Sequence, residues 1–171
     1  MSDSRNPKLP RLAVLAVAAG LFLTNLGGHG VVSEELRWAE IAREMRASGD
    51  WFRPAINGEP YFDKPVGSYW LIVLASHLTG EVDEFTARLP AAVAGLLGVW
   101  LLMSLAGRWY GPAVGVLAGA VLATSFGFAF YSRRATADNE TVTGVLAAVW
   151  LFDRMGQTWL PSGCSWASPR R

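Results

Sequence analysis

The stretch LPAAVAGLLGVWLLMSLA, residues 89–106, carries no charged side chain and decides the fold. As an α-helix it is about 27 Å long, close to the ~30 Å hydrocarbon core of a bilayer. A second stretch, PAVGVLAGAVLATSFGFAFY at 112–131, is also long enough to cross, and the short link GRWYG joins the two. We therefore expect two membrane-spanning helices. The GxxxG pair Gly115 and Gly119 marks close packing against a neighbour that the sequence does not identify.

The composition of the whole chain agrees with a membrane protein. Of its 171 residues, 51% are hydrophobic and only 17% are charged, which is unusual for a soluble domain. Its tryptophans suit membrane–water interfaces. The formal net charge of +1 gives no global field that would attract nucleic acid. The one cysteine, Cys164, excludes an internal disulfide.

An apolar run at 12–26 follows a polar, basic start. This pattern is shared by signal peptides and by uncleaved first transmembrane helices. We favour the helix, because no clean cleavage site precedes Glu34 and more apolar segments follow. The basic residues then keep the N-terminus in the cytoplasm; they are Arg5, Lys8 and Arg11.

The segment SEELRWAEIAREMRASGD, residues 33–50, predicts an amphipathic helix. Ser33 is placed to cap its N-terminus and Gly49 to end it. Such a helix is suited to lie on the membrane surface. The residues expected on or near its apolar side are Leu36, Ala39, Ile41, Ala42 and Met45.

Residues 66–79, VGSYWLIVLASHLT, are apolar but only about 21 Å long as a helix, too short to cross. We expect an interfacial or re-entrant helix on the outer side. Glu34, Lys64 and Asp138 then face the same, non-cytoplasmic side. If 66–79 did cross, Asp138 would lie opposite Glu34, and Arg108 would lie outside, against the positive-inside tendency. Arg133 and Arg134 count against the favoured arrangement.

A last apolar stretch runs from about Thr141 to Phe152. The expected architecture is an all-α membrane protein with about four transmembrane helices and interfacial helices on the periplasmic side. We assign residues 1–155 to the membrane domain. Residues 156–171 form a polar tail, rich in Ser, Pro and Gly, that has the character of a truncation or frameshift product.

Three ordered motifs carry a family resemblance: EELRWAEIAREMRASGDWFRPAINGEPYFDKPVGSYWL, then FTARLPAAVAGLL, then YSRRATADNETVT. Over roughly residues 11–155 the chain resembles the N-terminal part of the polyprenyl-phosphate-sugar-dependent membrane glycosyltransferases. This is the GT-C-type family of the lipid A aminoarabinose transferase and the protein O-mannosyltransferases. The resemblance implies a GT-C-type fold, of which this sequence holds the first crossings.

The resemblance makes Glu34 the first candidate catalytic residue. An Asp-Glu pair follows the first transmembrane helix in the family, and Glu34-Glu35 stands there in this chain. Transfer from a lipid-phosphate sugar passes through an oxocarbenium-like state, and a carboxylate must take the acceptor's proton or orient the acceptor. Glu is one methylene longer than Asp, which is enough to misplace a base. The alternative is a solvated charge in the first turn of a helix.

Asp138, in RRATADNE, is the second candidate acid. The resemblance places a functional Asp here, near the acceptor or supporting the base. The alternative role is an N-cap for a helix that begins near Asn139 or Glu140. The family usually has two hydroxyl residues before this Asp, whereas this chain has Thr136 and Ala137.

Lys64, in YFDKPVG, is the candidate for the donor phosphate. A fixed cation must neutralise the charge that builds on the leaving group, and lysine serves phosphate as a point charge. Pro65 restricts the backbone, and aromatic residues such as Tyr61 suit the interface. The alternative is an ordinary snorkelling lysine in an aromatic belt. The family typically has KPP, and Val66 replaces its second proline here.

Further residues complete the candidate site. Asp63 stands where the family has an acid before the lysine, and the resemblance implies a divalent-metal contact there that needs a His much further along. The favoured alternative is a simple contact of Asp63 with Lys64 or with an arginine. No other cofactor is implied. Arg133 and Arg134 are candidates for anionic headgroups, with interfacial anchors as the alternative. The remaining substrate-binding candidates are Glu35 and Arg37.

Together these residues predict transfer of a sugar from a polyprenyl-phosphate carrier to a lipid or protein acceptor at the outer face of the inner membrane. The partners are then the lipid-linked donor, the acceptor and membrane lipids, without nucleic acid. The alternative is a non-catalytic truncated relative or a membrane lipid-binding scaffold. A transporter fragment is disfavoured, because the charged residues cluster at the surface rather than around a midplane site.

Overall fold

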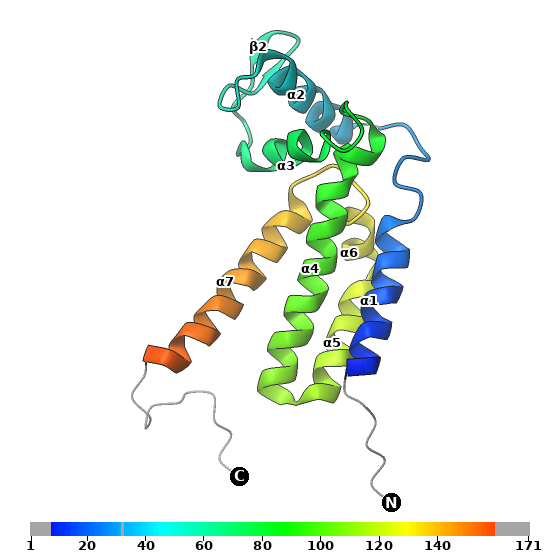
Figure 1. The fold of residues 1–171 in the computed structure, drawn as a ribbon, viewed down its shortest axis with the longest axis vertical. Coiled ribbons are helices and arrows are strands. Elements are labelled where there is room, and N and C mark those ends of the chain that lie inside the picture. Colours follow the sequence, from blue (N-terminus) through cyan, green and yellow to red (C-terminus); the bar gives the residue numbers. More distant parts are fainter. Residues whose placement is uncertain (1–7, 32, 160–171) are drawn as a thin grey trace, which may run out of the picture.

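A computed structural model of the chain describes residues 8–31 and 33–159. The long helices run side by side and form what we call the stem, and shorter elements lie across one end of it and form the cap (Figure 1). The stem consists of α1 (Lys8–Leu23), α4 (Glu84–Tyr110), α5 (Pro112–Thr124), α6 (Phe126–Tyr131) and α7 (Asp138–Trp159). The cap consists of α2 (Glu34–Ser48), the antiparallel strands β1 (Ala55–Ile56) and β2 (Glu59–Pro60), and α3 (Gly67–Ala75).

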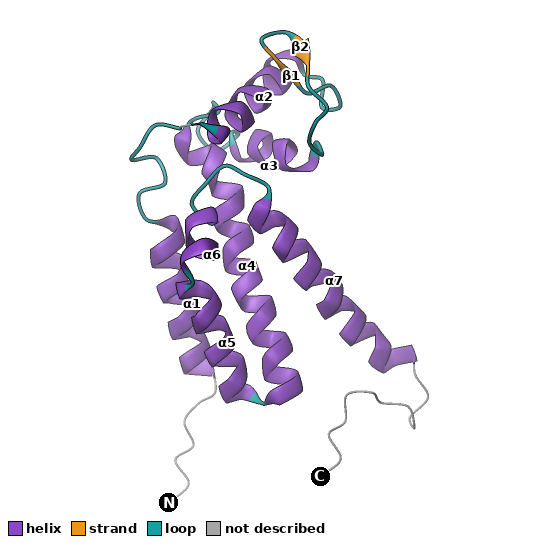
Figure 2. Cartoon of the chain, turned by 180° about the vertical axis from the view of Figure 1, so that it is seen from behind, coloured by secondary structure: helices purple, strands orange, loops and turns teal. Residues whose placement is uncertain are grey.

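The central helix of the stem is α4, with α7 on one side of it and α1 and α5 on the other (Figure 2). A capping box begins α4: Asp83 accepts the backbone N–H of Thr86, and the Thr86 hydroxyl accepts the N–H of Asp83. With 27 residues, α4 is the one helix in the described part of the chain that is long and apolar enough to cross a membrane. The helix predicted at 89–106 is confirmed, although it begins earlier, at Glu84.

The helices α4 and α5 form a close hairpin. Gly111 makes the turn between them with a φ of 100°, which favours glycine. A Cβ on Gly115 would lie 2.7 Å from the Cα of Gly107, and a Cβ on Gly119 would overlap the side chain of Met103. The close packing predicted from the GxxxG pair is confirmed, and its neighbour is α4.

The apolar segment 112–131 is not one helix, contrary to the expectation. It is interrupted at Ser125, whose ψ of 130° is extended, and so divides into α5 and α6. Hydroxyl groups explain the interruption. Thr124 donates to the carbonyl of Ala120 and Ser125 donates to that of Leu122, and such bonds bend helices. The two helices together still reach from the Gly111 turn to the cap (Figure 1).

The apolar side of α2 packs against α3 and α4, and its place on the membrane surface stays a prediction. Ile41 and Met45 are buried in a cluster with Tyr69 of α3. Leu36 is 50% exposed, against the prediction, and Glu35 is buried in its place. Glu35 is buried because it forms an ion pair with α4, and this pair sets the rotation of α2 about its axis.

The ends of α2 agree with the prediction only in part. Gly49 ends the helix with a φ of 71°, and its N–H donates to the carbonyl of Met45. Ser33 stands at the N-cap position, but its side chain makes no capping hydrogen bond. This prediction is wrong because Ser33 has a φ of 53°, whereas a capping serine needs an extended backbone.

The short helix α3 has nine residues and is about 14 Å long. It is therefore much shorter than a hydrocarbon core, which supports the expectation that 66–79 does not cross. A second observation agrees, since Glu35 accepts the backbone N–H of Ala135 at 3.0 Å. Glu34 and Asp138, which neighbour these two residues, lie at the same end of the stem.

The last helix, α7, is attached to α4 at two places. Toward the cap, the Thr143 hydroxyl donates to the carbonyl of Ala94 at 2.7 Å. Near the far end, Asp153 is 3% exposed, pairs with Arg108 at 2.7 Å and accepts from Trp109 at 3.1 Å. The helix continues to Trp159, beyond the domain boundary expected at 155. The rest of the expected tail, including Cys164, lies outside the described residues.

Candidate functional site

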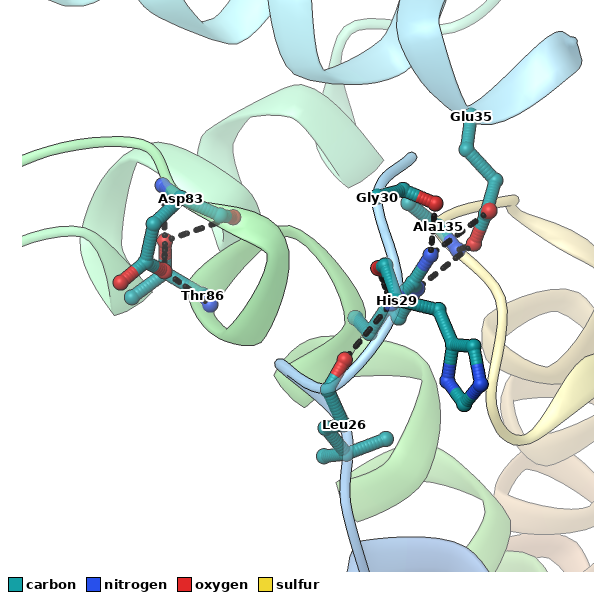
Figure 3. A network of polar contacts seen from close by, with 8 residues as sticks. Leu26, His29, Gly30, Glu35, Asp83, Thr86 and Ala135 are labelled. Atoms are coloured by element: carbon teal, nitrogen blue, oxygen red, sulfur yellow. Dashed lines mark hydrogen bonds and ion pairs between the residues drawn. The ribbon is translucent and has the colours of Figure 1, made fainter. Parts of the chain in front are cut away.

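A buried ion pair joins the cap to the stem (Figure 3). Arg88, near the start of α4, donates to the two carboxylate oxygens of Glu35 at 2.9 and 3.0 Å. Their side chains are only 7% and 2% exposed. Such a bidentate arrangement is the geometry in which a buried charge pair offsets the cost of leaving water.

The same network holds two loops. The Arg88 guanidinium also donates to the carbonyls of Leu26 at 2.6 Å, His29 at 2.7 Å and Gly30 at 3.1 Å, in the loop that leads to α2. Glu35 in turn accepts the Ala135 N–H, in the loop that leads to α7. The network therefore fixes the starts of both helices, where the two candidate acids Glu34 and Asp138 stand.

Arg88 is a residue that the sequence reasoning missed, although it stands in the ARLP motif. The available signal was a charged residue at the start of an apolar membrane helix, which needs a partner. Glu35 was expected to bind substrate. In the structure its oxygens accept from Arg88 and from the N–H of Ala135, and its contact with substrate stays a prediction.

A second polar group lies on the exposed side of the cap. Arg37 donates to Glu34 at 2.7 Å and to the hydroxyl of Tyr61 at 2.8 Å, and its guanidinium lies 5.8 Å from the centre of the Tyr61 ring. Behind it, the ring of Tyr69 packs 4.8 Å from that of Trp38. Burial raises the pKa of Tyr69 to about 12, and nearby Tyr61 adds to the shift, so Tyr69 stays a neutral hydroxyl. Three of the expected residues, Glu34, Arg37 and Tyr61, are thus in contact.

Lys64 and Asp63 are exposed in the loop between β2 and α3. Neither side chain forms a hydrogen bond or ion pair with any residue of 8–31 or 33–159. Within those residues the structure brings together no group of three His, Cys, Asp or Glu side chains that fits a metal ion. The metal contact expected at Asp63 therefore remains a prediction that needs further ligands.

Arg133 and Arg134 line a cavity of about 390 Å³, which is also lined by the loop between α1 and α2 and by residues of α2, α4 and α6. Arg133 donates to the carbonyls of Leu21 at 3.0 Å and Thr24 at 2.9 Å, and so closes the C-terminal end of α1. Arg134 lies over the ring of Phe130 at 4.5 Å. Glu35 and Arg88 also line this cavity, whereas Arg37, Tyr61 and Lys64 do not. The expected binding residues thus fall into two groups, those that line this cavity and those on the exposed side of the cap.

Asp138 is the first residue of α7 and is exposed. It is inside the helix rather than before it, so the alternative role as an N-cap is not observed. Glu140, which precedes the apolar part of α7, is partly buried and accepts the Ser68 hydroxyl of α3 at 3.1 Å. Burial raises the pKa of Glu140 to about 7, the bond from Ser68 opposes the shift, and the charge of Asp138 adds to it.

The raised pKa of Glu140 predicts a pH-dependent stability. The folded carboxyl holds its proton up to about pH 7, while the unfolded one loses it near 4.5. The free energy of unfolding therefore falls as the pH rises between these values. Glu140→Gln keeps the acceptor for Ser68 but carries no charge. It is expected to be more stable than the wild type above pH 7, by up to about 3 kcal/mol, and equal to it below pH 4.

SDS titrations of both proteins in mixed micelles at several pH values measure this difference. The exposed residue Glu81 supplies the control, since Glu81→Gln is expected to leave the pH profile of stability unchanged. A Glu140→Gln gain that is the same at pH 4 and pH 8 would contradict the role assigned to the carboxyl proton.

The comparison with known proteins agrees with this architecture. The family model described as dolichyl-phosphate-mannose-protein mannosyltransferase matches residues 63–167, more than half of the chain. An undecaprenyl phosphate-alpha-4-amino-4-deoxy-L-arabinose arabinosyl transferase from Pseudomonas savastanoi pv. phaseolicola is 40% identical over 121 residues, 69% of this chain and 22% of that protein. The protein with the same description from Pseudomonas paraeruginosa is 42% identical over 67% of this chain and 21% of its own length.

A solved structure has the same fold. The crystal structure of ArnT from Cupriavidus metallidurans bound to undecaprenyl phosphate superposes with a TM-score of 0.78 at 33% identity, covering 91% of this chain and 28% of that one. The apo structure of the same protein gives the same TM-score at 30% identity. The chain spans about a fifth of the length of the curated relatives it matches. It belongs to the dolichyl-phosphate-mannose-protein mannosyltransferase family of GT-C membrane glycosyltransferases, and it matches the N-terminal part of ArnT.

Proposed function

We propose that this chain forms the N-terminal part of a site that transfers a sugar from a polyprenyl-phosphate carrier to a lipid or protein acceptor. The observation that carries the proposal is the exposed contact of Glu34, Arg37 and Tyr61 in the cap. It joins a carboxylate, a cation and an aromatic hydroxyl at the end of the stem where the other candidate acid, Asp138, also lies.

The donor is a lipid phosphate held at the edge of the membrane. Lys64 is exposed and has no partner among the described residues, so its ammonium group is open to a phosphate. Arg37 is held by the exposed Glu34 and the partly buried Tyr61 and is able to exchange them for phosphate oxygens. The solved relative bound to undecaprenyl phosphate supports this class of donor. Undecaprenyl phosphate aminoarabinose is the donor that the relatives' descriptions suggest.

The chemistry needs one base and one stabilised leaving group. An acceptor hydroxyl attacks the anomeric carbon, its proton passes to the Glu34 carboxylate, and the bond from that carbon to the phosphate oxygen breaks. The negative charge gained by the phosphate is stabilised by Lys64 and Arg37. Asp138 supports the acceptor from the start of α7.

The same geometry orients the chain in the membrane. We propose that α1, α4, the α5–α6 pair and the apolar part of α7, from about Thr141 to Phe152, cross the inner membrane, with the cap on the periplasmic side and the N-terminus in the cytoplasm. Arg108 and Arg154 stand near the C-terminal ends of α4 and α7, and these ends lie away from the cap (Figure 1), as the positive-inside tendency requires. The catalytic groups then face the outer surface.

A second candidate function is a non-catalytic scaffold that binds the lipid carrier. It rests on the exposed Lys64, whose ammonium group is able to bind a lipid phosphate whether or not transfer follows. Binding and transfer distinguish the two candidates, because a scaffold binds undecaprenyl phosphate without turnover.

The test is sugar transfer by membranes that contain this chain, from radiolabelled undecaprenyl phosphate aminoarabinose to extracted acceptor lipid. Loss of one charge-stabilising group typically lowers turnover about 100-fold. We expect losses of that order for Lys64→Ala and Glu34→Gln, and no loss for the exposed control Arg53→Ala.

Binding of undecaprenyl phosphate separates the two roles. It is expected to weaken in Lys64→Ala and to persist in Glu34→Gln. Binding without transfer by the inserted wild-type chain would establish the scaffold instead, and transfer that survives both substitutions would reject the proposed site.

A further inference from the structure

A cavity of about 210 Å³ lies between α1 and α4 toward the end of the stem away from the cap. We call it the α1–α4 cavity. The described residues that line it include no carboxylate; among them are Lys8, Arg11, Leu12, Trp100, Met103 and Ser104. It is separated from the candidate donor groups by the length of the stem, so neither Lys64 nor Glu34 takes part in it.

The charged side of the cavity comes from the first turn of α1. Lys8 and Arg11 stand three positions apart and therefore lie on the same side of the helix. The Nε–H of Arg11 is buried and has no acceptor among the described residues. The guanidinium lies over Gly107, where a Cβ would come within 2.9 Å of its Nη2. A buried N–H donor without an acceptor is unfavourable, and a phosphate oxygen is a strong acceptor for it.

Arg108, toward the same end, differs from Arg11 in having an acid partner. Arg108 pairs with Asp153 at 2.7 Å, and the second oxygen of Asp153 accepts from Trp109. Arg154 lies over the ring of Trp150 at 4.6 Å. Of these three guanidinium groups, that of Arg11 has a buried Nε–H without an acceptor among the described residues.

The rest of the cavity is apolar and continues onto the outer surface of the stem. Leu12 is 61% exposed and Trp100 is 42% exposed, so both side chains extend from the cavity to the surface that lipid would cover. The Ser104 hydroxyl is bonded to the carbonyl of Trp100 and does not compete for the cation. An anion that carries a hydrocarbon chain fits this surface better than a free ion, because its chain covers the exposed leucine and tryptophan.

We propose that the α1–α4 cavity binds the headgroup phosphate of an anionic phospholipid, with one acyl chain along Leu12 and Trp100. An anionic lipid is favoured over a zwitterionic one because the described lining residues include two cations and no acid to receive a choline or ethanolamine group. The site rests on α1 and α4 crossing the membrane and is independent of the sugar-transfer proposal.

Native mass spectrometry of the full chain in detergent tests the proposal. Phosphatidylglycerol and phosphatidylcholine with the same acyl chains are titrated separately. We expect one phosphatidylglycerol to bind at least 10-fold more tightly than phosphatidylcholine. Arg11→Gln is expected to remove most of this preference. Ser104→Leu, which fills the cavity without changing charge, is expected to weaken phosphatidylglycerol binding at least fivefold.

The matched control is Arg53→Gln, which removes the same charge from an exposed position in the cap and is expected to bind phosphatidylglycerol like the wild type. Circular dichroism checks that each variant is folded. If Arg11→Gln does not fold, the phosphatidylglycerol affinity of Ser104→Leu tests the proposal instead. Equal affinity for the two lipids, an equal loss in Arg53→Gln, or wild-type binding by Ser104→Leu overturns the proposal. Tight binding of soluble glycerophosphoglycerol would overturn the role of the acyl chain and leave a simple phosphate site.

Discussion

Replacement of Arg88 by methionine is expected to lower the free energy of unfolding by about 3–5 kcal/mol. Methionine keeps an apolar chain of similar length but removes the cation that holds the buried carboxylate of Glu35. It also removes the donor that three carbonyls of the loop before α2 share. The loss is measured by SDS titration in mixed micelles, with far-UV circular dichroism as the signal.

Two further variants make the Arg88 result specific. Arg43→Met breaks an exposed pair with Glu40, whose side chains are 43% and 42% exposed, and is expected to cost no more than about 1 kcal/mol. The double variant Glu35→Met/Arg88→Met is expected to recover part of the loss, since the uncompensated charge is gone. An Arg88→Met loss no greater than that of Arg43→Met would show that the pair does not hold the cap on the stem.

The second large effect is expected for Gly115→Ala, which forces α4 and α5 apart. The new methyl group would lie 2.5 Å from the carbonyl oxygen of Met103 and 2.7 Å from the Cα of Gly107. Both atoms belong to the backbone of α4, so no side-chain rotation relieves the overlap. Overpacking of this kind typically costs 1–3 kcal/mol, and we expect a loss near the upper end, about 2–3 kcal/mol.

The control for Gly115 is a glycine in an open position of another stem helix. Gly144 in α7 has no atom within 4 Å of the place where its Cβ would lie. Gly144→Ala is therefore expected to leave the free energy of unfolding unchanged or to raise it by up to about 1 kcal/mol, because alanine has the higher helix propensity. Equal effects of the two substitutions would mean that α4 and α5 are not closely packed in the membrane.

The stem was predictable because its signal is local. Apolar length identified α4, and the spacing of Gly115 and Gly119 identified a close helix contact, since both depend on neighbouring residues alone. The interruption at Ser125 was missed, because a hydroxyl residue in an apolar run bends a helix only when it bonds to the backbone of the preceding turn.

The cap was less predictable because its decisive contacts are distant in the sequence. Helical periodicity placed Leu36 on the buried side of α2, but the structure buries Glu35, whose partner Arg88 lies 53 positions away. Without that partner a buried Glu is a poor expectation. The Arg37–Tyr61 contact spans 24 positions, and no local pattern of the two residues indicates that they meet.

The candidate site follows the same division. The family resemblance identified Glu34, Arg37, Tyr61 and Lys64, and the structure brings the first three into contact. The resemblance did not indicate that Arg133 donates hydrogen bonds to the carbonyls at the end of α1. Helix-end contacts of this kind depend on where α1 ends in space, which residue types alone do not specify.

The Glu35–Arg88 pair also imposes an order of events during synthesis. Glu35 leaves the ribosome 53 residues before Arg88 and 100 residues before Ala135. At about 5–20 residues per second, the carboxylate waits roughly 3–10 s for its cation, and longer for the last amide. The ion pair cannot form until the first turns of α4 have been made, and the bond to Ala135 forms later still. Attachment of the cap to the stem through this ion pair is therefore a late step of assembly, which follows synthesis of the start of α4.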